Sequence, residues 1–256
     1  MSRRRSRVSG PVALAVLATM SILVGLTSTR PASAASPTCA QRGNYYDGYL
    51  TAGRPQPIAV EGVRGAISNP GGYGLCGSDG SAANFTTSWV MIVDRDAHRY
   101  GQSGYMYNAN LPRGCVRLWA QDDFGFGPAD YYTGGCVPLD AVYTFWEQMV
   151  KVNYSTYHLR SNVDTTMIHE SSSNPFDYWP QPFQIQVFNE VTYPGSDIAG
   201  RIDNKQNFTT LQAQRFSDDT YVSFVNNVPL GASSDIPGKW KYEALAPDNL
   251  RLWEEP

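Results

Sequence analysis

Short stretches rich in Val, Ile, Thr, Tyr, Phe and Trp recur from residue 56 onward, and clusters of turn-forming residues separate them. Alternation of apolar and polar positions at a period of two is typical of strands with one buried face. The pattern predicts ten strands, which are Pro57–Ser68, Phe85–Asp94, His98–Tyr107, Gly114–Gln121, Val142–Val150, Tyr154–Arg160, Val163–His169, Phe183–Thr192, Asn207–Phe216 and Thr220–Asn226.

This many strands without a long helical pattern favours an all-β fold. We expect a single-domain antiparallel β-sandwich or jelly roll of the concanavalin-like kind over residues 35–256. One segment is ambiguous, because the apolar residues of Leu139–Val152 also fall partly on one face of a helix. The segments Thr38–Arg54 and Ala246–Pro256 are expected to be an irregular N-terminal arm and an irregular C-terminal tail.

The strand period places particular polar side chains beside aromatic ones. In Phe183–Thr192, Glu190 shares a face with Gln184, Gln186 and Phe188. In His98–Tyr107, Gln102 shares a face with Tyr100, Gly104 and Met106. A face of this kind lines either solvent or a concave cleft of a sandwich.

The first 34 residues have the organisation of a secretory signal peptide. Four arginines lie within residues 2–7, an uncharged apolar run follows from Val12 to Leu26, and Ala32–Ala34 provides a small-residue cleavage pattern. The run is shorter than the roughly 20 residues that a membrane-spanning helix needs. We therefore expect a secreted, extracellular protein with no membrane attachment after cleavage.

Removing this segment changes the charge of the chain. The whole sequence has 20 basic and 23 acidic residues, but five of the arginines lie in residues 1–34, so the remaining chain has a net charge of −8. A chain this acidic is not a strongly basic nucleic-acid binder, and we expect no nucleic-acid partner.

All four cysteines, Cys39, Cys76, Cys115 and Cys136, lie after the export signal. An even number of cysteines in an exported chain predicts two disulfides. Three pairings are possible, and the sequential one, Cys39–Cys76 with Cys115–Cys136, is the one we favour. The spacings do not match a zinc site, the three histidines show no metal-binding spacing, and no metal or other cofactor is expected.

The aromatic content, with 16 tyrosines and six tryptophans, is high for one domain. Aromatic rings stack on the apolar faces of sugars, so the candidate ligand-binding residues are Tyr100, Trp89, Trp146 and Phe188. The alternative is that the tryptophans fill a β core.

Five short motifs follow one another along roughly residues 60–200, and these are Gly62–Ser68, Thr87–Ile92, Tyr100–Gly104, Phe145–Glu147 and Val187–Glu190, with a trailing Gly200. In content and order they resemble motifs of secreted actinobacterial proteins of mostly unknown function. They are also similar to those of the glutamic peptidases, or eqolisins, and more distantly to those of the neprosin-type domain.

The resemblance to glutamic peptidases implies a β-sandwich and two catalytic candidates. Gln102 would match the glutamine that holds and polarises the scissile carbonyl, and Glu190 would match the glutamate that activates water. A carboxylate can act as a general base while a neutral amide donates a hydrogen bond to a developing oxyanion. This sequence has Ser103-Gly104 after the glutamine where the family has Ala-Gly, and it lacks the Ala-Glu-Trp signature.

Three functions therefore remain open. The leading hypothesis is a non-enzymatic, lectin-like sandwich, a monomer that binds neutral extracellular polysaccharide or a protein surface through an aromatic concave face. The first alternative is a glutamic-type endopeptidase that uses Gln102 and Glu190. The second is a jelly-roll glycoside hydrolase with Glu147 and Glu190 as its paired carboxylates.

Overall fold

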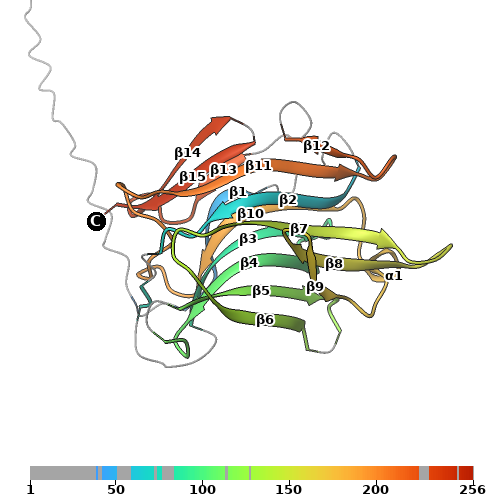
Figure 1. Cartoon of the computed structure of the whole chain (residues 1–256), viewed down its shortest axis with the longest axis horizontal. Coiled ribbons are helices and arrows are strands. Elements are labelled where there is room, and N and C mark those ends of the chain that lie inside the picture. The colour runs from blue at the N-terminus through green and yellow to red at the C-terminus, as the bar shows by residue number, and fades with distance from the viewer. Residues whose placement is uncertain are drawn as a thin grey trace, which may run out of the picture. The chain divides into compact units, whose positions relative to one another are not determined.

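We analysed a computed structural model of the chain, which describes residues 39, 42–50, 59–71, 74–76, 84–112, 115–126, 128–224, 231–246 and 248–255. The predicted export signal lies outside these residues. The described strands form two antiparallel sheets that pack face to face as a sandwich (Figure 1). The predicted fold class is confirmed.

The first sheet has seven strands and includes several neighbours that are far apart in sequence. Its order is β13 (Gly231–Ser234), β1 (Tyr45–Leu50), β10 (Gln184–Val191), β3 (Phe85–Val93), β4 (Tyr100–Asn108), β5 (Val116–Asp123) and β6 (Asp130–Val137).

The second sheet has eight strands. Its main order is β14 (Trp240–Ala246), β15 (Asn249–Glu254), β11 (Gln206–Arg215), β2 (Val60–Ser68), β7 (Val142–Lys151), β8 (Tyr157–Val163) and β9 (Thr166–Glu170), and β12 (Tyr221–Ser223) pairs with β11. The single turn of helix α1 (Pro175–Tyr178) begins after Asn174, whose side chain accepts a hydrogen bond from the Phe176 backbone N–H.

The main core lies between the sheets and follows the strand alternation. In β3, Val90 and Ile92 face this core, whereas Trp89 and Met91 belong to a separate apolar cluster on the outer face of the seven-stranded sheet. The seven-stranded sheet is therefore covered by apolar side chains on both faces near its centre.

The segment Leu139–Val152 contains strand β7, which agrees with the predicted strand Val142–Val150 and excludes the helical alternative. The expectation of irregular chain ends is wrong. The expected irregular arm contains β1, and the expected irregular tail contains all of β15, so both ends of the domain are built into the sheets. The ten predicted strands also omit β6, β13 and β14.

The two predicted disulfides, Cys39–Cys76 and Cys115–Cys136, are both present. Disulfides form and persist in oxidising compartments, so the structure indicates an oxidising environment for the folded chain. No helix among the described residues is long and apolar enough to cross a membrane.

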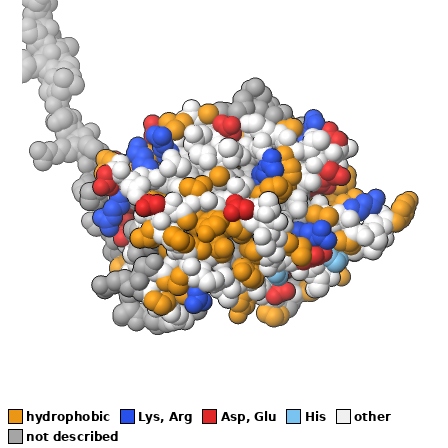
Figure 2. All heavy atoms as spheres, in the orientation of Figure 1, with side chains coloured by type: hydrophobic (Ala, Val, Ile, Leu, Met, Phe, Trp, Pro, Cys, Tyr) orange, Lys and Arg blue, Asp and Glu red, His pale blue; other side chains and the backbone are white. Residues whose placement is uncertain are grey.

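The face of the molecule seen in Figure 2 carries acidic and basic side chains interspersed with polar and apolar ones. No single sign of charge dominates this face.

Candidate functional site

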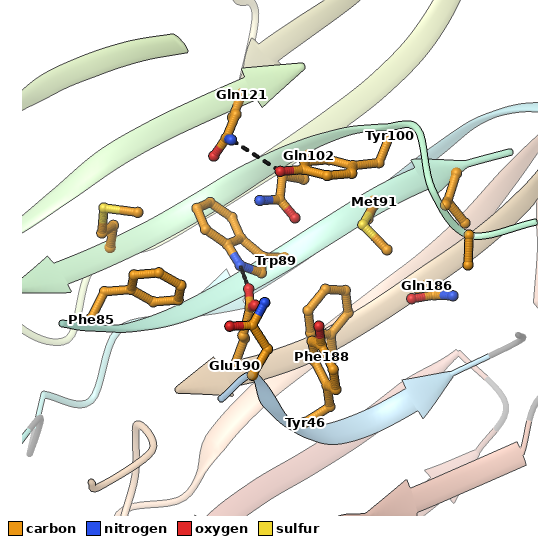
Figure 3. Close-up of a pocket in the computed structure, with 14 residues that line it drawn as sticks. Tyr46, Phe85, Trp89, Met91, Tyr100, Gln102, Gln121, Gln186, Phe188 and Glu190 are labelled. Carbon is orange, nitrogen blue, oxygen red and sulfur yellow. Dashed lines mark hydrogen bonds between the residues drawn. The ribbon is translucent and has the colours of Figure 1, made fainter. Parts of the chain in front are cut away.

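A pocket of about 540 Å³ opens on the outer face of the seven-stranded sheet (Figure 3). Strands β10, β3 and β4 provide most of its walls, and β1 and β5 close its sides. Fourteen residues line it, which are Asn44, Tyr46, Phe85, Trp89, Met91, Val93, Ala97, Tyr100, Gln102, Met106, Gln121, Gln186, Phe188 and Glu190.

The floor of the pocket is apolar. Trp89 lies opposite Phe188 on β10 and opposite Gly104 on β4, and both aromatic side chains are almost fully buried. A Cβ atom at position 104 would collide with the backbone carbonyl oxygen of Ser88 and would also contact the Trp89 ring. Because position 104 has no side chain, β3 and β4 can approach each other closely there, and the Trp89 indole lies against this position.

Glu190 is the one acidic residue that lines the pocket. Its Oε2 accepts a hydrogen bond of 3.1 Å from Trp89 Nε1, and only 6% of the residue is exposed. Burial raises the pKa of Glu190 to about 7, and the indole N–H offsets a part of this shift because it stabilises the carboxylate. The carboxyl group can therefore change its charge near neutral pH.

Gln102 is the second polar residue that the sequence placed here. It lies between Met91 and Gln121 on the neighbouring strands, and its amide makes no hydrogen bond with any described side chain or backbone group. Beside it, Gln121 Nε2 donates a hydrogen bond of 3.0 Å to the Tyr100 hydroxyl. The Gln102 amide is thus free to bind a ligand in the pocket.

Gln102 and Glu190 line the same pocket, but on different rows of the sheet. On β3, Gln102 pairs with Met91 and Glu190 pairs with Thr87. Four residues of strand correspond to roughly 13 Å between the two backbone positions along the strand direction. Figure 3 shows the Trp89 side chain between the two groups, so a ligand that contacts both must extend across the indole.

Tyr46 and Asn44 come from the N-terminal segment that sequence reasoning took to be irregular. The Tyr46 ring packs edge-on against Phe188, with a centroid distance of 5.5 Å. Burial and the nearby Glu190 raise the pKa of Tyr46 to about 12, so its hydroxyl stays protonated and can donate a hydrogen bond. The tyrosines at positions 45, 46 and 49 are the feature of the sequence that could have indicated this strand.

Five of the predicted site residues therefore line one pocket, and these are Trp89, Tyr100, Gln102, Phe188 and Glu190. Trp146 does not line it, because its strand β7 belongs to the other sheet and its ring lies on the outer face of that sheet, beside Arg64 and Tyr221. That residue belongs to a different surface from the one expected.

Glu147 is also outside the pocket. It is fully buried in the sandwich interior on β7, next to Phe145 and Met149, which face the main core on the same strand. Burial raises the pKa of Glu147 well above its usual range, while nearby Ser103 and Ser161 oppose this shift. The structure does not bring Glu147 and Glu190 together in one cleft.

The histidines near these elements make structural ion-pair contacts. His169 Nε2 lies 3.0 Å from Asp122 Oδ2, and this contact connects the two sheets at the β5 and β9 edges. Within the described parts of the chain, no cluster of three or more His, Cys, Asp or Glu side chains could hold a metal ion.

No family model and no curated protein matches this sequence. The solved structures do include similar folds. A scytalidoglutamic peptidase bound to a peptide-based transition-state analogue has a TM-score of 0.51 and 10% sequence identity, and the match covers 84% of this chain and all of that one. The same enzyme with a transition-state analogue inhibitor gives 0.51 at 9% identity over the same shares of each chain. SCP-B, a member of the eqolisin family solved with the tripeptide Ala-Ile-His, gives 0.48 at 10% identity over those shares.

At this identity the likeness concerns the fold and leaves the chemistry of the pocket to be argued from its own residues. The chain has the β-sandwich fold of the glutamic peptidases.

Proposed function

We propose that the protein is a lectin-like β-sandwich whose pocket binds a neutral sugar residue of an extracellular polysaccharide. The observation that carries this proposal is the composition of the pocket wall. Five aromatic rings and the four carboxamide side chains of Asn44, Gln102, Gln121 and Gln186 surround a cavity of about 540 Å³ that has Glu190 as its one acidic lining residue.

This composition fits the chemistry of a neutral sugar. The partly exposed rings of Tyr46, Phe85 and Tyr100 offer apolar surface for the C–H face of a pyranose, above the floor made by Trp89 and Phe188. A carboxamide both donates and accepts hydrogen bonds, as a sugar hydroxyl does. Convergent amides in an aromatic pocket are therefore suited to an uncharged, polyhydroxylated ligand.

An aromatic strip continues from the pocket along the same face of the sheet. Trp119 on β5 stacks on Tyr131 of β6, with a centroid distance of 5.0 Å and an interplanar angle of 4°, and Tyr131 is 58% exposed. Tyr131 lies directly opposite the pocket residue Gln121. A polymer seated in the pocket would reach this exposed ring with its next residues.

Substitutions in the pocket and in the aromatic strip test separately whether each surface binds the ligand. We expect Tyr100→Ala to weaken binding of a disaccharide and of the polysaccharide about tenfold, because loss of one stacking ring removes about 1–2 kcal/mol. Tyr131→Ala should weaken polysaccharide binding and leave disaccharide binding unchanged. Tyr154→Ala, at a residue that is 94% exposed, is the matched control.

The measurement is a glycan array followed by affinity electrophoresis or calorimetry on the best ligand. The absence of glycan binding across the array, or equal losses in the Tyr100→Ala and Tyr154→Ala variants, would reject the lectin-like function. A protein surface would then be the remaining partner class.

A second candidate function, a glutamic-type endopeptidase, is favoured by the Glu190–Trp89 hydrogen bond and the free Gln102 amide in the fold of that family. Glu190 would accept a proton from water, and Gln102 would donate a hydrogen bond to the carbonyl oxygen as it becomes negative. The separation of the two residues by the Trp89 ring places this candidate second.

Casein hydrolysis measured from pH 2 to pH 9 tests this candidate. If Glu190 is a general base, activity rises with pH through about 7 and both Glu190→Gln and Gln102→Ala abolish it. Equal activity in the wild type and Glu190→Gln would exclude a catalytic Glu190. The glycosidase alternative has no support from the geometry, because Glu147 is enclosed between the sheets.

A further inference from the structure

The outer face of the eight-stranded sheet carries an arginine held between two aromatic rings. Arg64 Cζ lies 4.3 Å from the Tyr221 ring centroid and 4.7 Å from the Trp146 ring centroid. Its Nε donates a hydrogen bond to Gln212 Oε1, and the Tyr221 hydroxyl donates one of 3.1 Å to Gln148 Oε1. The guanidinium is thus fixed in orientation before any ligand arrives.

The terminal nitrogens of Arg64 remain available. No hydrogen bond or ion pair with a described residue uses Nη1 or Nη2, and the residue is half-buried rather than enclosed. A planar guanidinium whose two terminal nitrogens are free matches the two oxygens of a carboxylate.

Hydrogen-bond donors exceed acceptors around this arginine. Trp146 Nε1 and Asn162 Nδ2, on neighbouring strands and directly opposite each other, are buried and have no acceptor among the described residues. Arg160 Nε, on the same strand as Asn162, is in the same state. The nearby side-chain acceptors Gln212 Oε1 and Gln148 Oε1 already accept from Arg64 and Tyr221, and Gln214 Oε1, opposite Gly62, is one buried acceptor that has no donor among the described residues.

The donors form a row across the sheet. Arg64 pairs with Trp146, and Trp146 pairs with Asn162, so the row crosses three adjacent strands and spans roughly 10 Å. A ligand carboxylate would bind the terminal nitrogens of Arg64, and further acceptor oxygens of the ligand would reach Trp146 Nε1 and Asn162 Nδ2 once these buried groups turn outward. A hexuronate within an oligosaccharide has this arrangement of oxygens.

We infer that Arg64, framed by Trp146 and Tyr221, is the centre of a second glycan-binding site that takes the carboxylate of a uronic acid residue. The site lies on the opposite outer face of the sandwich from the pocket, so it does not depend on the function proposed above. The sequence, with its net charge of −8 after the export signal, favoured neutral ligands. The attraction inferred here is a local contact, because at physiological salt charges beyond about 8 Å are largely screened.

The test measures binding of tetragalacturonate and of the neutral galactose tetramer by calorimetry. We expect the wild type to prefer tetragalacturonate. Arg64→Lys should lose about tenfold to a hundredfold in affinity for it, because an ammonium keeps the charge but cannot form the bidentate contact. Arg95→Lys, at an exposed arginine in the turn after β3, is the control with the same chemical change.

The Lys variant keeps the positive charge and most of the side chain, and its circular dichroism spectrum verifies folding. Unchanged tetragalacturonate binding by Arg64→Lys, or an equal loss of binding in Arg95→Lys, would overturn the inference. Equal binding of a hexaglutamate peptide would also overturn it, because the site would then recognise carboxylates without recognising a sugar. Tyr154→Ala, at an exposed residue outside both sites, should leave tetragalacturonate binding unchanged.

Discussion

The charge of the pocket depends on Glu190, whose carboxyl group is buried and hydrogen-bonded to Trp89. The Trp89 indole fixes the carboxyl group at the pocket floor, while burial removes the water that would keep it charged. The group is therefore neutral in mildly acidic solution and charged in alkaline solution. A neutral carboxyl both donates and accepts hydrogen bonds, so ligand affinity and stability should both depend on pH.

Glu190→Gln should remove this dependence. The folded-state pKa of about 7 lies above the usual 4.5, so the contribution of Glu190 to stability is fully present below pH 4.5 and is lost as pH rises through 7. The shift corresponds to about 3 kcal/mol. We expect the free energy of unfolding of the variant, relative to the wild type, to rise by up to that amount between pH 4.5 and pH 8 in urea titrations. A constant difference across this range would contradict the buried titration.

At the scale of the residue, the sequence identified Gln102 and Glu190 because strand alternation places each beside aromatic side chains. It could not identify which residues of other strands would face them. The pocket needs β1, β10, β3, β4 and β5 side by side, and this order is not the order in the chain. Tyr46 and Asn44 were missed for this reason.

The strands that sequence reasoning missed have recognisable physical causes. In β1, Asp47 occupies a fully buried position, so the polar residue interrupts the apolar alternation. Strand β6 is an edge strand with no fully buried residue, and it therefore leaves no periodic signal. Strand β7 was predicted, and its helical alternative arose because Phe145 and Met149 face the core while Trp146 and Val150 face outward, so that apolar residues on both faces imitate helical spacing.

Gly104 offers a test of how closely β3 and β4 must approach. Gly104→Ala would place a Cβ against the Ser88 carbonyl oxygen, which is backbone and cannot rotate away. We expect a loss of about 1–3 kcal/mol in the free energy of unfolding, together with weaker ligand binding as the Trp89 ring shifts. Thermal and urea denaturation measure the first effect.

Gly135→Ala is the matched control, because the same Cβ on β6 would meet no atom within 4 Å. That variant should be neutral or slightly stabilising, since alanine restricts the unfolded chain more than glycine does. Similar losses in both variants would show that strand glycines matter here through backbone flexibility and not through the close approach of β3 and β4.

At the scale of the whole molecule, the sandwich encloses an unusual number of carboxyl groups with raised pKa values. Burial raises the pKa of Asp47 to about 7, that of Glu61 to about 8 and that of Glu254 to about 7, and it raises that of Glu147 strongly. Glu190 adds to this set. Because the pKa of each group is higher in the folded state than in the unfolded chain, each group stabilises the folded state at any pH at which it is protonated there.

The protein should therefore be most stable in mildly acidic solution. Every one of these groups loses its stabilising contribution as pH rises from about 4.5 toward 8, and His169, whose pKa the Asp122 contact raises, acts in the same direction. The lowered pKa values of Asp96 and Asp218 belong to exposed groups, where solvent screening keeps the effect small. We expect the midpoint of thermal unfolding to be higher at pH 5 than at pH 8 in differential scanning calorimetry. A higher midpoint at pH 8 would contradict the raised pKa values of the buried carboxyl groups.

The order of strands in the two sheets also decides when this chain can fold. Strand β1 lies between β10 and β13, and β2 lies between β7 and β11, so partners of the first two strands are made only after residue 140, and some only after residue 205. Pairings this distant in sequence form slowly, because a long loop must close before any contact forms. The seven-stranded sheet needs β13 and the eight-stranded sheet needs β14 and β15, so neither sheet is complete until the last part of the chain has been made. Until then the unpaired edges of the partly formed sheets are exposed, and the chain depends on protection from aggregation.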